Sequence, residues 1–82
     1  MNGSLDARKK NAIVKAINHI PEYEEFTAVD IRSNVKELCG IDLHQSVIGG
    51  RLKYYSNSKR IIQLNKGSSN EIIRYKRLRT VH

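Results

Sequence analysis

The chain has one cysteine, one proline and no tryptophan among its 82 residues, and no long apolar run. A single cysteine, Cys39, cannot form an internal disulfide, which fits a reducing, cytoplasmic location. No apolar stretch approaches the roughly 18 residues that a membrane-spanning helix needs, so we expect no contact with a membrane. Of the few aromatic residues, Phe26, Tyr55 and Tyr75 are expected in the core and Tyr54 is expected to be exposed. One exposed ring is not the stacking platform that single-strand-binding proteins use.

Acidic residues are nearly absent from the second half of the chain. Up to Asp42 there are six lysines and arginines against seven acids. After Asp42 there are nine lysines and arginines against one acid, Glu71. A half-domain with this charge attracts polyanions, and nucleic acid is the commonest partner of that kind. The charge pattern therefore predicts positive potential on the second half and a negative face around residues 22–25.

The length predicts one domain, 1–82, with its core between about residues 5 and 78. Such a small domain leaves little room for an active-site cavity. Asp42, His44 and Ser46 are the residue types of a catalytic triad. However, side chains two residues apart on a helix diverge by about 200°, so we expect no hydrogen-bonded relay among them. The histidines and Cys39 lack metal-ligand spacing, so the sequence predicts no enzyme, cofactor or metal site.

Helical periodicity with start and stop signals predicts two helices before Gly40. The first spans 5–20, with Ser4 as its N-cap, Asp6 in its first turn and Pro21 as its stop. After an extended acidic segment, 22–26, Thr27 and Asp30 form a capping-box pair that starts the second helix. Gly40 ends it, because glycine tolerates the left-handed conformation at that position.

Apolar spacing predicts a third helix at about 44–56, with only Ile41 and Asp42 between the stop at Gly40 and the next apolar pattern. The segments RIIQLN and EIIRYKRL, joined by KGSSN, alternate with a period of two and predict a hairpin. Its expected inward face consists of Ile62, Leu64, Ile73 and Tyr75. The expected core of the helices consists of Ile13, Ile17, Ile31, Val35, Leu38, Ile48, Leu52 and Tyr55.

This order of elements resembles the winged helix-turn-helix superfamily over residues 5–78. The resemblance is carried by FTAVDI, the turn CGIDL, the helix VIGGRLKYY and the basic hairpin, which corresponds to the wing (59–79). It implies an α+β fold with three helices and a C-terminal two-stranded hairpin. It also implies sequence-specific binding of double-stranded DNA, with the third helix in the major groove and the hairpin on phosphates or in the minor groove. By analogy the chain is expected to be a small transcriptional regulator. Its expected location is the cytoplasm or nucleoid, or a host cytoplasm if the protein is viral, and a homodimer is possible.

Carried over by position, the resemblance implies a set of DNA-binding residues on the third helix and the hairpin. Gln45 can pair bidentately with adenine, and Ser46 can bond a base edge or a phosphate. Two explanations do not involve DNA. The polar side of the third helix could simply face solvent, and the lysines of the hairpin could prevent its exposed strand edge from pairing with another chain. The implied residues are His44, Gln45, Ser46, Gly49, Gly50, Arg51, Lys53, Lys59, Arg60, Lys66, Ser68, Arg74, Lys76 and Arg77.

Gly49 and Gly50 are unusual, because each glycine inside a helix costs about 1 kcal/mol relative to alanine. They either let DNA approach the helix backbone or relieve crowding where the second and third helices cross. Two other functions stay open. The same surface could bind a partner protein, with the acidic segment 22–25 as a docking face on the opposite side, or the domain could bind RNA or single strands.

Overall fold

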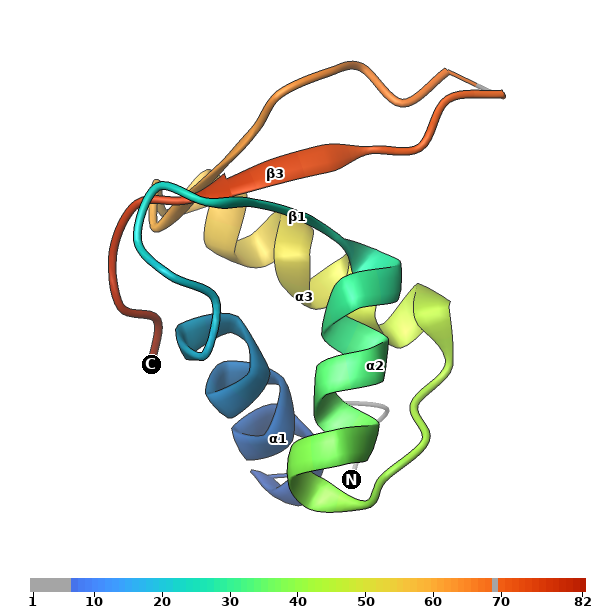
Figure 1. Ribbon diagram of the computed structural model, residues 1–82. Helices are drawn as coiled ribbons and strands as arrows, with labels where there is room; N and C mark the ends of the chain where they lie inside the picture. The colour runs from blue at the N-terminus through green and yellow to red at the C-terminus, as the bar shows by residue number, and fades with distance from the viewer. Residues whose placement is uncertain (1–6, 69) are drawn as a thin grey trace.

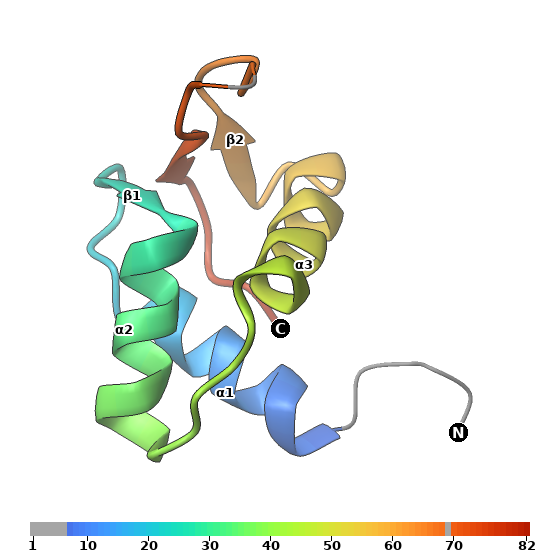
Figure 2. The same cartoon turned by 90° about the vertical axis from the view of Figure 1, so that its right-hand side faces the viewer.

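Three helices and a three-stranded antiparallel sheet make up this α+β domain in the computed structural model, which describes residues 7–68 and 70–82 (Figure 1). The elements follow one another along the chain as α1 (Ala7–Asn18), β1 (Glu25–Thr27), α2 (Ala28–Cys39), α3 (Gln45–Asn57), β2 (Ile61–Gln63) and β3 (Arg74–Arg77). The expected cap Ser4 and first-turn Asp6 lie outside the described residues. In both views the sheet lies over one end of the helices, and the loop joining β2 to β3 projects away from them (Figure 2).

The predicted boundaries of α2 are confirmed by its cap geometry. The hydroxyl of Thr27 accepts a hydrogen bond from the Asp30 amide at 3.3 Å, and the Asp30 carboxylate accepts one from the Thr27 amide at 2.9 Å. This reciprocal pair satisfies amides that have no partner within the helix. At the other end Gly40 has φ 66°, and its amide donates to the Lys36 carbonyl. The left-handed conformation of Gly40 turns the chain away from α2, and five residues, 40–44, connect α2 to α3.

The sheet has the strand order β1-β3-β2, so β3 is its centre. Phe26 of β1 pairs with Tyr75 of β3, and Gln63 of β2 pairs with Tyr75 from the other side. The rings of Phe26 and Tyr75 stack with their centroids 5.8 Å apart, and both residues are buried. The segment expected to be extended, 22–26, thus contributes a strand to the same sheet as the hairpin, which the sequence did not predict.

The predicted inward face of the hairpin is wrong at Ile62 and Leu64. Ile61 is fully buried, whereas 38% of Ile62 is exposed. Because side chains alternate across a strand, a shift of one residue exchanges the two faces. Either Ile61 or Ile62 could face the core, because the two isoleucines are adjacent. The chain direction after α3 decides between them. The Arg60 amide donates to the Tyr55 carbonyl, and Ile61 then lies against the core. The strands are also shorter than the segments 60–65 and 71–78 that were expected.

The core contains every residue predicted for it except Leu38, which is half-buried near the end of α2. The sequence pattern missed Leu43 and Val81, which lie outside the helices and strands. Val81 is buried, its amide donates to the Asn18 side chain at 2.9 Å, and its carbonyl accepts from that side chain at 3.0 Å. The core also contains Ala12 and Ala16 of α1, Ile20 just after it, and Ile61 of β2.

No helix in the described part of the chain is long and apolar enough to cross a membrane.

Replacing Leu52 by alanine should lower the free energy of unfolding by about 2–5 kcal/mol, because this side chain is fully buried where α3 meets the rest of the core. Urea unfolding monitored by circular dichroism measures the change. Val47→Ala on the same helix is the control: Val47 is 36% exposed, and its loss should change the free energy by less than about 0.5 kcal/mol. Equal effects of the two changes would contradict the assigned phase of α3.

Candidate functional site

The outward face of α3 carries the polar residues that the sequence singles out. Ile48, Leu52 and Tyr55 are buried, which confirms the predicted phase of the helix. Gln45, Ser46, Gly50 and Lys53 are exposed, and Gly49 is half-buried. The helix therefore presents an uncrowded polar surface over its first two turns.

His44 is the N-cap of α3, one residue before the helix begins. Its Nδ1 accepts a hydrogen bond from the Ser46 amide at 3.1 Å and lies 2.8 Å from the Ser46 hydroxyl. An N-cap acceptor satisfies an amide that has no helical partner. The divergence of about 200° expected for side chains two apart on a helix does not apply to this pair, because His44 lies outside the helix. Asp42 is bound to Arg32 at 3.1 Å instead, so the three residues form no relay.

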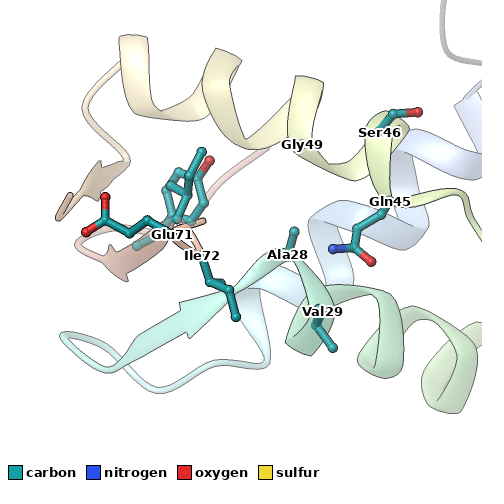
Figure 3. Close-up of a pocket in the computed structure, with 9 residues that line it drawn as sticks. Ala28, Val29, Gln45, Ser46, Gly49, Glu71 and Ile72 are labelled. Carbon is teal, nitrogen blue, oxygen red and sulfur yellow. The ribbon is translucent and has the colours of Figure 1, made fainter. Parts of the chain in front are cut away.

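A groove of about 420 Å³ lies between the start of α2, the start of α3 and the hairpin, which we define as residues 61–77 (Figure 3). The amide of Gln45 extends into this groove, whereas the hydroxyl of Ser46 points away from Ala28 and Val29. The carboxylate of Glu71 also points away from Gln45. Three segments far apart in sequence therefore converge on one surface. The groove is lined by Ala28 and Val29 of α2, by Gln45, Ser46 and Gly49 of α3, and by residues 71–73 and Tyr75 of the hairpin.

Two exposed apolar side chains line this groove and were missed by the sequence analysis. Val29 is 51% exposed and Ile72 is 68% exposed. A signal for each is present in the sequence. Val29 lies off the apolar stripe of α2, and Ile72 is adjacent to Ile73 in an alternating segment, so one of the two isoleucines must face outward. An apolar residue out of phase with its element is a candidate for contact with a partner.

Gly49 and Gly50 are not required by the packing of the helices. A Cβ atom built on either glycine meets nothing within 4 Å. This excludes the explanation that they relieve crowding between α2 and α3. The explanation that remains is a bare backbone surface, which Gly49 contributes directly to the groove.

The bases of the hairpin are partly balanced by β1. Arg74 and Glu25 form an ion pair at 3.1 Å, with about half of each side chain exposed. Glu25 also lies opposite Lys76 in the backbone register of β1 and β3. The prediction that the acidic segment 22–25 lies opposite the hairpin is therefore wrong, because β1 is hydrogen-bonded to β3. An exposed pair of this kind is worth about 0–1 kcal/mol, so another anion can compete for the arginine.

Glu71 is held by the loop at the end of the hairpin. Its carboxylate accepts hydrogen bonds from the amides of Gly67 and Ser68 at 3.2 and 3.3 Å, and from the Ser68 hydroxyl at 3.4 Å. The Ser68 amide is the main cause that lowers the pKa of Glu71 below its ordinary value of 4.5. The acid thus stabilises the loop that carries Lys66 and Ser68.

The remaining predicted residues lie apart from the groove. The guanidinium of Arg51 lies over the ring of Tyr54, 4.3 Å from its centroid, and donates to the Tyr55 hydroxyl at 3.3 Å. Arg60 donates to the Thr80 carbonyl at the base of the hairpin, and Lys59 precedes it with φ 63°. Lys66 is exposed on the hairpin loop, and Arg77 is half-buried opposite Ile61 of β2.

Comparisons with protein-family models, curated proteins and solved structures find no match for this chain. Within residues 7–68 and 70–82, no group of three His, Cys, Asp or Glu side chains is placed to hold a metal ion.

Gly49→Ala and Gly50→Ala should each raise the free energy of unfolding by about 0.5–1 kcal/mol, because alanine favours the helix and its methyl group meets nothing. Urea unfolding of the two variants measures this gain. Gly40→Ala is the matched control: at φ 66° alanine should instead cost about 1–2 kcal/mol. A loss of stability in both helix variants would show that the glycines serve the fold.

Glu71 should titrate below its ordinary pKa of 4.5 in the folded protein, because loop amides stabilise its carboxylate. Its contribution to stability is then present above the ordinary pKa and is lost as the pH falls through the lowered value. Carbon-detected NMR of the side-chain carboxyl measures this pKa. The same titration in urea is the control, since unfolding should return the pKa to its ordinary value. A folded pKa at or above 4.5 would contradict the hydrogen bonds.

Proposed function

We propose that this chain is a winged helix-turn-helix domain that binds double-stranded DNA, with α3 in the major groove and the hairpin on the phosphates. The observation that carries the proposal is the convergence of Gln45 and Gly49 with the hairpin on one groove. A helix that fits the major groove beside a basic strand pair is the arrangement this mode of binding uses. A role as a small transcriptional regulator follows by analogy, because fold alone does not fix function.

The uncrowded surface of α3 supports this proposal. Two glycines in one helix cost about 2 kcal/mol together, and nothing in the packing of the described residues offsets that cost. A bare helix surface has a use when a partner must approach the backbone closely. The exposed amide of Gln45 is on the same side of the helix and can discriminate a base edge.

The charge of the hairpin supports contact with phosphates. Lys66 is exposed on the hairpin loop, and Lys53 is exposed on the third turn of α3. Arg74 can exchange Glu25 for a phosphate, because an exposed ion pair contributes little free energy. These positive side chains would position the duplex without reading its sequence.

The proposal is tested by selecting duplexes from a random pool and measuring their affinity at several salt concentrations. A DNA complex should weaken steeply, since each phosphate contact releases counterions. An affinity that does not change with salt would indicate an apolar contact with a protein, and stronger binding of RNA than of duplex DNA would also overturn the proposal. Sizing of the selected complex tests the expected homodimer.

The groove and the hairpin loop should make different contributions to that binding. Gln45→Ala should cost about 1–3 kcal/mol on the selected site and little on random DNA, because it removes a contact to a base. Lys66→Gln should weaken binding to both and make the slope of log K against log salt shallower by about one unit. Fluorescence anisotropy with labelled duplexes measures both effects.

Lys36→Gln is the control for charge, since Lys36 is exposed in the last turn of α2, away from the groove. It should leave the salt slope unchanged. If Lys36→Gln and Lys66→Gln gave the same slope, net charge alone would govern binding, and the assigned surface would be wrong.

A further inference from the structure

The groove beside α3 is apolar on the side that faces Gln45. Val29 of α2 and Ile72 of the hairpin are 51% and 68% exposed, and both line it. They come from separate elements, and Figure 3 shows the Ile72 side chain extending toward the start of α2, where Val29 lies. Large apolar side chains left in water on two converging elements indicate a partner with an apolar group at this position.

We propose that this groove recognises the 5-methyl group of thymine, so that the protein prefers A·T base pairs. This inference rests on the DNA binding proposed above and adds to it the kind of sequence that is read. The thymine methyl is the apolar group that the base pairs present in the major groove. Val29 and Ile72 offer that methyl group an apolar surface beside the helix.

The polar residue of the groove favours the same base pair. The amide of Gln45 extends into the groove, and glutamine pairs bidentately with the N6 and N7 atoms of adenine. An A·T pair thus offers a polar edge to Gln45 and a methyl group to the apolar side of the groove. Among the described residues that line the groove there is no lysine or arginine, the types that pair with guanine.

The space and the charge around the groove fit a base edge as the occupant. Gly49 leaves the floor of the groove on α3 without a side chain, so the edge of a base can approach the helix. Lys53 lies one turn beyond Gly49 on α3, and Lys66 lies on the hairpin loop. These positive side chains attract the phosphates of a duplex, which brings the bases between them toward the apolar residues.

The experiment compares a duplex selected by this protein with the same duplex in which deoxyuridine replaces thymidine. The replacement removes only the methyl group and leaves the base pairing intact. The deoxyuridine duplex should bind about fourfold more weakly for each methyl group in contact with the protein. Selected sites should also be rich in A·T pairs.

Two variants assign the effect to the groove. Val29→Ala and Ile72→Ala should bind the thymidine duplex more weakly and reduce the difference between the two duplexes. Val47→Ala and Ile62→Ala are the matched controls, because these residues are also exposed but lie outside the groove. The controls should keep the full difference. All four side chains are at least 36% exposed, so the variants should fold.

Equal affinity for the thymidine and deoxyuridine duplexes would overturn the inference and leave duplex binding in place. A methyl effect that persists undiminished in both groove variants would also overturn it, because the methyl group would then be recognised elsewhere. Failure to bind any duplex would overturn the proposed function itself.

Discussion

The pairing of β3 with β1 is the constraint on which the candidate site depends. β3 belongs to the hairpin, whereas β1 leads directly into α2, so their hydrogen bonds join the hairpin to the helices. The stacked rings of Phe26 and Tyr75 anchor this junction in the core. An isolated two-stranded hairpin is marginally stable in water. With β1 as a third strand, the hairpin is held at a defined position beside α3, and a groove with fixed walls results.

Local signals in the sequence predicted the described ends of the helices to within two residues: α1 ends at Asn18 and not at residue 20, and α3 spans Gln45–Asn57 and not 44–56. The Thr27–Asp30 capping box and Gly40 each act within a few residues, so they can be recognised without knowledge of the rest of the fold. The sheet depends on contacts between distant segments. The strand at Glu25–Thr27 is only three residues long, and its partner lies about fifty residues further along the chain. The Ile61-Ile62 repeat fits two phases, and packing against α3 decides between them.

The candidate site was predictable in its residue types and only partly in its arrangement. Gln45, Ser46 and Gly49 were placed on the outer face of α3 by their position in the resemblance, and the buried face of the helix agrees with it. The roles of His44 and Arg51 could not be predicted, because one caps the helix and the other lies against Tyr54. Long polar side chains adopt whatever contact the neighbouring elements offer, and those neighbours are fixed only by the tertiary structure. Val29 and Ile72 could not be assigned to the site from the sequence, because only the tertiary structure brings α2 and the hairpin together beside α3.

The two hydrogen bonds between the Asn18 side chain and the Val81 backbone affect the order in which the domain forms during synthesis. The two residues are 63 positions apart, and the amide side chain of Asn18 binds both backbone groups of Val81 as a neighbouring strand would. Helix α1 leaves the ribosome early, but its last turn acquires these partners only after residue 81 has emerged. Until then the side-chain amide of Asn18 lacks the two backbone partners that it has in the folded domain. The packing around the end of α1 is therefore completed only after residue 81 has been synthesised, and not when α1 itself forms.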